Sequence, residues 1–431
     1  MAAQPAPGRR RPRRSRAIVT LSFATLLAGA PAGERAHALT TADVERAAAW
    51  ATSGLRAVTG RLSADGYEGR DNDTPGSARA QRFLVARLRD VGPGLDAARP
   101  GDDAYRQAFD VDGVRGTNLL AIVPGRELPD EYVVVGAHYD HIGRRCDRSP
   151  GGRICNGAID NATGVAAVLA LGSALRRLPE PPRRSVVLAL WDAEEDGLVG
   201  SRHYVAQPIV PLERTVAYVN FDMLGGRLLP SLARTSFAVA PETGGELLQG
   251  AVDAAIAAEG LGTRSLSYIF GQLRSDYASF VEGSVPTVFF SDSEGPCYHS
   301  TGDDLHLVDW DKLAAQSRIA FRVVVALAES PARPEFVPPN PALAVFSDAV
   351  ALRDVFALGR RDLALFRGAD RDRLLELDAQ MHAIVADGPS AFDADDVGVV
   401  LGAAVEAIEL IGRLECPKRD ARGPWAGPAS D

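Results

Sequence analysis

The sequence has 431 residues, of which 47 are Lys or Arg and 56 are Asp or Glu, so its formal net charge is −9. This acidic balance argues against a nucleic-acid partner, because nucleic-acid binding needs a basic surface. Four cysteines are too few to hold a chain of this length together, so we expect a hydrophobic core to stabilise the fold.

Residues 1–38 are typical of an export signal peptide. Arginines are concentrated in residues 9–16, an apolar stretch covers residues 17–30, and Ala36-His37-Ala38 provides a small-x-small cleavage pattern. We expect cleavage after Ala38 and an exported protein, periplasmic or extracellular. The leader carries seven Arg and one Glu, so the mature chain would have a net charge of about −15. Arg13-Arg14 leaves twin-arginine export open beside general secretion.

The rest of the chain is not expected to enter a membrane. No segment after the leader is expected to reach transmembrane length, so we expect no membrane anchor once the signal is cleaved. Cys146 and Cys155 flank a loop rich in Pro and Gly, which favours a local disulfide between them. Cys297 and Cys416 could pair or remain free, and the sequence leaves both alternatives open.

Secondary structure is predicted from residue 40 onward. A helical pattern covers residues 40–91, after which strands and helices alternate. The predicted strands are Gln107–Val111, Asn118–Val123, Tyr132–Ala137, Ser185–Trp191, Thr215–Phe221, Ser236–Ala240 and Val285–Phe290. The predicted helices are Gly164–Leu178, Gly200–Ala206, Gly244–Glu259, Ser275–Glu282 and Asp311–Glu329. This alternation predicts an α/β fold, a three-layer α/β/α sandwich around a largely parallel mixed sheet.

The C-terminal part of the chain has a different pattern. Five prolines in residues 331–342 predict a linker without regular structure. Residues 343–431 are predicted to be a helical extension, because apolar residues repeat there at helical spacing. Such apolar faces must be buried, and we expect this extension to pack on the core or to form a small cap. A substrate lid or a dimer contact remains the alternative.

The first candidate site residues follow the apolar strand Tyr132–Ala137. A short β-branched run is typical of a strand that is buried on both faces, and the carboxyl ends of such strands face ligand crevices. His138 would lie at this end, and Asp140 would lie on the same side two residues later. A histidine oriented by a carboxylate is typical of a metal ligand. The alternative is a histidine in a surface loop with an acidic neighbour.

Further acidic residues follow other predicted strands or helix starts. Asp160 lies at a loop-to-helix junction, where it could also be a simple helix cap. The pair Glu194-Glu195 follows Ser185–Trp191, Asp222 follows the next strand, and His299 lies shortly after Val285–Phe290. Two histidines and three acidic residues at successive strand ends are the ligands expected for two cations that share a bridging carboxylate.

These residues, in this order, resemble those of a known enzyme family. The phrases His138-x-Asp140, Asp160-Asn161, Glu194-Glu195, Asp222 and Tyr298-His299 are similar to the motifs of the co-catalytic zinc aminopeptidases related to aminopeptidase Y and the bacterial secreted leucyl aminopeptidases. The resemblance covers residues 41–329 and implies a zinc peptidase domain at 39–330. This domain lies between the signal peptide at 1–38 and the linker at 331–342, and the extension at 343–431 is outside the family pattern.

The resemblance also implies a role for each metal ligand. Two divalent ions, expected to be Zn²⁺, would be bridged by Asp160. His138 and Asp222 would complete one site, and Glu195 and His299 would complete the other. The expected substrates are peptides with a free N-terminus.

The remaining site residues would act beside the metals. Glu194 would be the general base that takes a proton from the attacking water and passes it to the leaving amine. The hydroxyl group of Tyr298 would help to stabilise the oxyanion, and Asp140 would support a ligand from the second shell. The oligomeric state, the preferred side chain and the native metal are not defined by the sequence.

Two alternative functions were weighed. A glutaminyl cyclase-like acyltransferase with a single zinc would share the fold and many motifs, but Asn161 and Tyr298 depart from that group, which tends to have a small residue and tryptophan there. A non-catalytic relative that binds peptide or metal would have no need of a base at Glu194. The sequence therefore favours the aminopeptidase.

Overall fold

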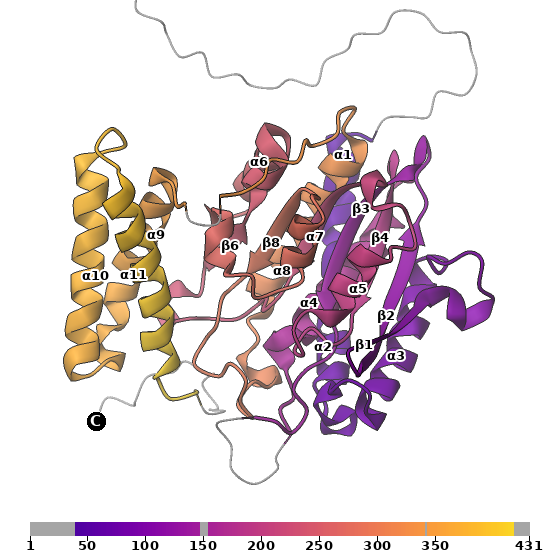
Figure 1. The fold of residues 1–431 in the computed structure, drawn as a ribbon, viewed down its shortest axis with the longest axis horizontal. Helices are drawn as coiled ribbons and strands as arrows, with labels where there is room; N and C mark the ends of the chain where they lie inside the picture. The colour runs from indigo at the N-terminus through magenta and orange to yellow at the C-terminus, as the bar shows by residue number, and fades with distance from the viewer. Residues whose placement is uncertain (1–38, 147–153, 341–342, 418–431) are drawn as a thin grey trace, which may run out of the picture. The chain divides into compact units, whose positions relative to one another are not determined.

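The computed structural model describes residues 39–146, 154–340 and 343–417. The predicted signal peptide at residues 1–38 lies outside the described residues, as do residues 147–153, 341–342 and 418–431. The unit that contains the described residues spans 38–431. The first seven helices and the sheet of this unit provide the frame for the candidate site (Figure 1).

An eight-stranded mixed sheet forms the centre of the fold, with the strand order β1-β2-β4-β3-β5-β8-β6-β7. The strands are β1 Arg106–Val111, β2 Val114–Val123, β3 Leu128–His138, β4 Arg184–Trp191, β5 Thr215–Phe221, β6 Thr235–Val239, β7 Gly262–Leu266 and β8 Thr287–Ser291. Strands β4, β3, β5 and β8 are parallel to one another. Strands β1 and β2 are antiparallel to their neighbours, and β6 is antiparallel to β8 but parallel to β7.

Eleven α-helices lie in the described part of the chain. They are α1 Thr41–Ala48, α2 Leu55–Leu62, α3 Pro75–Val91, α4 Thr163–Leu175, α5 Val199–Ala206, α6 Gly245–Ala257, α7 Tyr277–Glu282, α8 Trp310–Glu329, α9 Phe346–Gly359, α10 Gly368–Asp387 and α11 Ala394–Gly412. Local signals mark their starts: Thr74 caps α3 ahead of Pro75, and Asp309 caps α8.

Alternating side chains of the central strands enter two separate cores, as the period of a strand requires. Val133 and Val135 pack in the core that α4 and α8 share with α1 to α3 and α6. Val134 points to the opposite face, where α5 and α7 pack and where the C-terminal helices join the same apolar cluster. The predicted three-layer α/β/α class is confirmed.

Two details differ from the sequence prediction. Strand β7 was missed, because Gly262-Thr263-Arg264-Ser265-Leu266 is short, polar and poor in β-branched residues at the edge of the sheet. No segment after the leader was expected to reach transmembrane length, yet Ala158–Leu175 is long and apolar enough to do so. It is 89% buried inside the fold, as a central core helix must be.

The C-terminal helices α9, α10 and α11 pack on one another and against the edge of the sheet (Figure 1). Asp348 at the start of α9 accepts hydrogen bonds from the backbone N and the hydroxyl of Ser267, at 2.9 and 2.7 Å. At the other end, a disulfide joins Cys416 to Cys297. A second disulfide joins Cys146 to Cys155, as the sequence favoured. The extension is therefore attached to the sheet-containing part of the chain at both of its ends.

Candidate metal centre

The sheet topology brings the candidate residues to one edge. Strand β3 lies between β4 and β5, and all three are parallel, so their carboxyl ends meet. His138 ends β3, Glu194 and Glu195 follow β4, and Asp222 follows β5. Asp160 approaches from the turn before α4, and the peptide bond between Asp160 and Asn161 is cis. The structure thus brings together the side chains that the sequence predicted as ligands.

The first candidate metal group consists of His138, Asp160 and Asp222, all buried. The Nε2 atom of His138 lies 3.3 Å from Asp222 Oδ1 and 3.4 Å from Asp160 Oδ1. One ligand atom from each residue lies within 4.8 Å of the others. Imidazole and carboxylate groups at such separations can hold a divalent ion of the zinc type.

The second candidate group contains His141, Asp160, Glu195 and His299. His299 Nε2 lies 3.0 Å from Glu195 Oε2 and 3.2 Å from Asp160 Oδ2. His141 Nδ1 lies 2.7 Å from Glu195 Oε1 and 3.7 Å from Asp160 Oδ2. This group has four side chains of the types that complete a tetrahedral zinc site.

Sequence reasoning missed His141. Its side chain is fully buried, and its Nε2 atom has no hydrogen-bond partner within the described residues. The imidazole ring of His141 packs closely against the backbone of Gly157, which has a φ of +56°. Only glycine leaves this space, because a Cβ at residue 157 would lie 2.5 Å from His141 Cδ2. The available signal was a second histidine three residues after His138, at the end of the same buried strand.

Asp160 links the two groups through different oxygen atoms. Its Oδ1 faces His138, whereas its Oδ2 faces His299 and His141. The backbone N–H of Asp160 donates to Asp303 Oδ2 at 3.0 Å, and the neighbouring N–H of Ile159 donates to Oδ1 of the same carboxylate at 2.9 Å. Asp303 therefore holds the turn so that both oxygens of Asp160 point into the centre.

The centre has the charge balance expected of a metal site. The carboxylates of Asp160, Glu194, Glu195 and Asp222 share it with three histidines, and those of Asp160, Glu194 and Asp222 belong to buried residues. Unpaired buried charge is costly and needs cations or protons. The donor set and its burial therefore fit one or two borderline-hard divalent cations.

The ionisation of these side chains reflects the same crowding. Burial raises the pKa of Glu194 well above its usual range, although the nearby His138 opposes this rise. Burial also acts to raise the pKa of Glu195, but His141 and His299 outweigh it and lower the value to about 2. The two adjacent glutamates thus differ: Glu195 is held as an anion between histidines, whereas Glu194 has a high proton affinity.

Asp140 supports the paired glutamates more directly than it supports His138. Its two carboxylate oxygens accept the backbone N–H groups of Glu194 and Glu195, each at 3.2 Å. The Nδ1 atom of His138 lies 3.3 Å from the backbone oxygen of Asp140 and 3.6 Å from its carboxylate. The carboxylate that the sequence analysis paired with the histidine therefore mainly orients the loop after β4.

Arg70 connects the two loops that carry the centre, the one after β3 and the one before Asp160. Its fully buried guanidinium group donates to backbone oxygens of Tyr139, Asn156 and Gly157 at 2.7 to 2.9 Å, and also to Leu62. Burial lowers its pKa to about 10, a shift that Asp160 opposes, so it remains a cation at neutral pH. It therefore ties the segment after β3 to the segment before Asp160.

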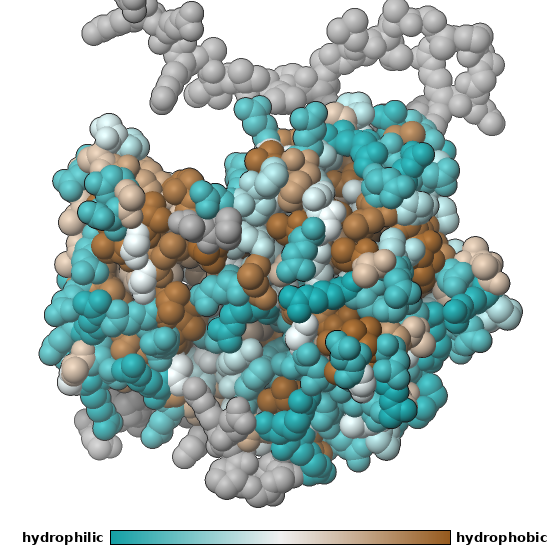
Figure 2. Space-filling view, in the orientation of Figure 1, coloured by the Kyte–Doolittle hydropathy of each residue, from teal (hydrophilic) through white to brown (hydrophobic). Residues whose placement is uncertain are grey.

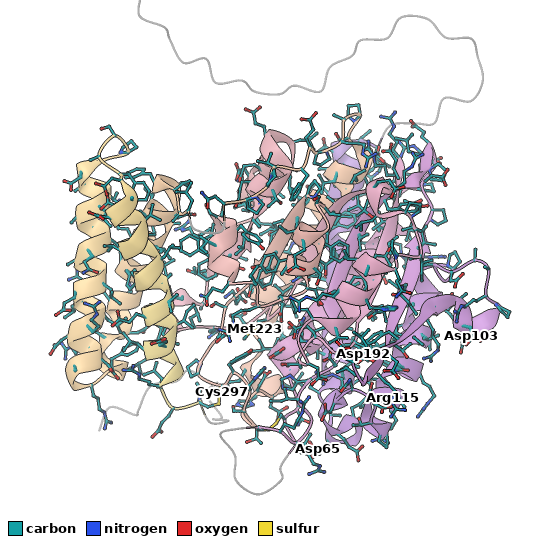
Figure 3. All side chains as sticks on the ribbon, viewed as in Figure 1. Asp65, Asp103, Arg115, Asp192, Met223 and Cys297 are labelled. Atoms are coloured by element: carbon teal, nitrogen blue, oxygen red, sulfur yellow. A yellow bond between two sulfur atoms is a disulfide. The ribbon has the colours of Figure 1, made fainter. Side chains whose placement is uncertain are left out.

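A cavity opens beside the centre, and Tyr298 lines it together with Asp160, Glu194, Glu195 and Asp222. The Tyr298 ring stacks on His299, with 3.8 Å between the ring centroids. Met223 and Cys297, labelled in Figure 3, lie between the lower end of the sheet and α11. All eight residues to which the sequence analysis assigned a role thus lie in or beside one centre.

Comparison with known proteins agrees with this geometry. Residues 118–324 match the model of Peptidase family M28. Aminopeptidase NAALADL1 of Mus musculus is 38% identical over 112 residues, which are 25% of this chain and 13% of the mouse protein. The aligned segments span only 13% to 38% of the length of the curated relatives.

Solved structures share the fold at low sequence identity. LapA aminopeptidase of Legionella pneumophila superposes with a TM-score of 0.54 at 19% identity, over 70% of this chain and 78% of LapA. Glutaminyl cyclase of Porphyromonas gingivalis superposes with a TM-score of 0.52 at 18% identity, over 63% of this chain and 97% of the cyclase. The resemblance noted from the sequence is confirmed, since residues 118–324 of this chain match the model of peptidase family M28.

Proposed function

We propose that this protein is an exported metallo-aminopeptidase that releases N-terminal residues from peptides with two zinc ions. The observation that carries this proposal is the position of Asp160, whose two oxygens face two separate ligand groups with Glu194 beside them. His138 and Asp222 would hold one ion. Glu195, His299 and the additional His141 would hold the other.

The residues have distinct tasks in peptide hydrolysis. When bound, the two ions supply Lewis acidity that activates water and polarises the scissile carbonyl. Glu194 accepts the proton of the attacking water and donates it to the leaving amine as the C–N bond breaks. The Tyr298 hydroxyl donates a hydrogen bond to the oxygen that becomes negative.

A free substrate amine complements the acidity of this centre. Glu194 and Glu294 line the cavity outside both ligand groups, and their carboxylates can accept hydrogen bonds from a free amine. This argument favours removal of residues from the N-terminus.

The glutaminyl cyclase alternative shares the fold, so the superposition does not discriminate between the two activities. The four-residue group of His141, Asp160, Glu195 and His299 supports a second ion, which a single-zinc cyclase would not use. Asn161 and Tyr298 also favour the peptidase, as the sequence comparison indicated. A protein that only binds peptide would need no base at Glu194.

The deciding experiment combines metal analysis with a substrate panel. We expect two zinc ions per chain by plasma mass spectrometry, release of free amino acids from aminoacyl chromogenic substrates, and loss of this activity with a chelator. One zinc per chain together with pyroglutamate formed from glutaminyl peptides would contradict the proposal.

Export is a separate part of the proposal. The signal-like residues 1–38 support it, and so do the pairs Cys146–Cys155 and Cys297–Cys416, because disulfides persist in oxidising compartments. N-terminal sequencing of protein from the periplasm or medium should start near Leu39. A cytoplasmic protein with an intact N-terminus would contradict this part.

A further inference from the structure

One short segment after β8, residues 297–303, carries several groups of the candidate metal centre, and we call it the ligand segment. His299 belongs to the second ligand group, and the ring of Tyr298 stacks on it. Asp303, the last residue of the segment, accepts the backbone N–H of Asp160 at 3.0 Å. The position of the ligand segment therefore determines one metal ligand directly and the bridging carboxylate through its backbone.

The ligand segment has no helix or strand that holds it in place. Its own hydrogen bonds form short turns: the Ser300 hydroxyl donates to the backbone oxygen of Cys297 at 2.7 Å, and the backbone N–H of Asp303 donates to that of Ser300 at 3.2 Å. His299 has a φ of +50°, which is uncommon for a residue with a side chain. Such turns fix the shape of the segment, whereas its place in the molecule depends on contacts with other parts of the chain.

The end of the C-terminal extension provides one of these contacts. Cys416, shortly after α11, forms the disulfide with Cys297 at the start of the ligand segment. The Cys416 sulfur also lies against the backbone of Gly302, where a Cβ would clash with it. The backbone oxygen of Pro417 lies 3.3 Å from Nε2 of His306. The residues after α11 therefore contact the ligand segment near both of its ends.

The rest of the extension is held by packing and does not depend on this disulfide. Figure 2 shows apolar side chains gathered between the C-terminal helices and the rest of the molecule. Helices α9, α10 and α11 share one apolar cluster with residues of the sheet. Asp348 also anchors the start of α9 to Ser267. Loss of the disulfide should therefore release the ligand segment and the residues after α11 while the extension stays folded.

We propose that the Cys297–Cys416 disulfide is a redox-controlled clamp that completes the second ligand group only when the chain is in an oxidising compartment. Because the two-metal centre and export are themselves proposed above, the clamp rests on the proposed function. The two cysteines are positioning residues, since they act through His299 and Asp303. In the reduced chain these two residues can shift, so the second ligand group holds its ion weakly.

Formation of the clamp is a thiol–disulfide exchange with a small disulfide compound. Cys416 is partly exposed, so its sulfur can attack this compound, form a mixed disulfide and release one thiol. Cys297, which is buried, then attacks the Cys416 sulfur, forms the S–S bond of the clamp and releases the second thiol. The protein loses two electrons to the small disulfide, and the two cysteine protons end on the two released thiols.

The first test measures zinc binding by competition with a chromophoric chelator. Cys297→Ala/Cys416→Ala removes the clamp and leaves no thiol there that could bind zinc itself. One of the two zinc affinities should fall by at least about 10-fold, the loss expected when a support of a ligand is removed, and the other should stay within about two-fold of wild type.

Reduction of the folded protein provides the matched comparison. Cys146→Ala/Cys155→Ala retains only the clamp disulfide, so treatment with a phosphine reductant, removed before zinc is added, should weaken the same zinc site in this variant as in wild type. The same treatment should cause no further loss in Cys297→Ala/Cys416→Ala. A zinc site that weakens equally on reduction of both double variants would overturn the clamp.

The second test uses metal-free protein and measures hydrogen exchange by mass spectrometry. Loss of the clamp should increase exchange at least about 10-fold in residues 297–303 and at Ile159 and Asp160, because local opening no longer breaks a covalent attachment. Amides of β3 and α10 should exchange as in wild type. Uniformly faster exchange throughout the sheet would show general destabilisation and would overturn a specific clamp.

The outcomes separate the clamp from the proposed function. Weaker binding of one ion with faster exchange in the ligand segment supports the clamp even if no peptide is hydrolysed. Two zinc affinities that stay within about two-fold of wild type would overturn the clamp and leave the aminopeptidase standing. If the chain binds a single ion, the exchange of the metal-free protein decides. Reduced wild-type protein gives the same measurements if the alanine variants do not fold.

Discussion

Two clusters of buried charge in this fold obtain their countercharge in different ways. Around Asp292 the protein supplies it: Lys312 Nζ lies 2.9 Å and Gln316 Nε2 lies 2.8 Å from Asp292 Oδ1, and both charged residues are at most 2% exposed. At the candidate metal centre the carboxylates of Asp160, Glu195 and Asp222 are grouped with three histidines. The first cluster contains its own countercharge, whereas the donor set of the second fits cations from solution.

The comparison separates a structural role from a chemical one. Lys312 also donates to the backbone oxygen of Gly226 at 2.7 Å, so its ammonium group is held in one position. Such a pair fixes α8 against the loop after β5. The donor atoms of the candidate metal centre are instead grouped so that a cation could be held between them.

The largest expected effect comes from Glu194, the acid of the metal centre that neither ligand group includes. Glu194→Gln keeps the size of the side chain but removes the proton acceptor, so kcat should fall by about 10²–10⁴. This loss corresponds to about 3–5 kcal/mol in activation free energy. Zinc content should stay at the wild-type level, whereas Asp160→Asn should lose both zinc and activity. Near-wild-type turnover of Glu194→Gln would contradict the base assignment.

The next largest effect is expected at the buried ion pair of Lys312 and Asp292. Lys312→Met leaves Asp292 as an unpaired buried acid and should lower the free energy of unfolding by about 3–5 kcal/mol. Urea denaturation monitored by circular dichroism measures this loss. Adding Asp292→Asn should restore most of the stability, because it removes the orphaned charge. If the single variant lost less than about 1 kcal/mol, the pair would not be the stabilising unit described above.

A smaller effect is expected from His141, which extends the ligand set beyond the sequence prediction. His141→Ala should weaken the binding of one of the two zinc ions by roughly 10- to 100-fold. Competition with a chromophoric chelator measures this change. His382→Ala on α10, half exposed and outside both metal groups, is the control. Two unchanged zinc affinities would remove His141 from the ligand set.

The smallest effect is expected at a surface network, where water screens the charges. Glu259 accepts from Arg318 at 2.8 Å and from Arg322 at 2.7 Å. Burial acts to raise the pKa of Glu259, but the two arginines outweigh it and lower the value. The folded state therefore gains stability above the unfolded pKa of about 4.3, and this gain is lost as the pH falls through the lower folded value.

Glu259→Gln should accordingly lower the free energy of unfolding by about 0.5–1 kcal/mol at pH 7. The difference between variant and wild type should shrink as the pH is lowered below about 4.3, because the wild-type carboxylate takes up a proton as the pH falls through its lowered folded pKa. Urea titrations over a series of acidic pH values provide the comparison. A difference that does not shrink with falling pH would point to lost packing and not to lost charge.

The sequence predicted the central strands well because they are buried on both faces and therefore uniformly apolar. Side chains at their ends were predictable for the same reason, since Asp222 or Glu195 after such a strand is chemically conspicuous. Strand β7 is polar and lies at an edge, so its pairing with β6 determines its conformation more than its own residues do.

Features of the fold and of the candidate site that depend on contacts between distant parts of the chain were not predictable from the sequence. His141 enters the ligand set only because Gly157, far along the chain, leaves space for its ring. The amphipathic pattern of residues 343–431 indicated buried faces, and the structure shows part of such a face, including Ala407 and Ile408, lining a cavity with β6 and β7. Cys297 and Cys416 are 119 residues apart, and sequence spacing cannot reveal a pair of that kind.

Arg70 has a consequence for where this chain can be truncated. It precedes residue 118, where the match to the peptidase family begins, yet it forms hydrogen bonds with the backbone on both sides of the metal-binding loops. The family segment is therefore not a self-sufficient module, and a fragment that starts at Asn118 would lack the residue that positions those loops. Lysine could not replace Arg70, since a single ammonium nitrogen cannot span four separate carbonyl groups. Domain grafting or truncation of this protein must keep the helices that precede the sheet.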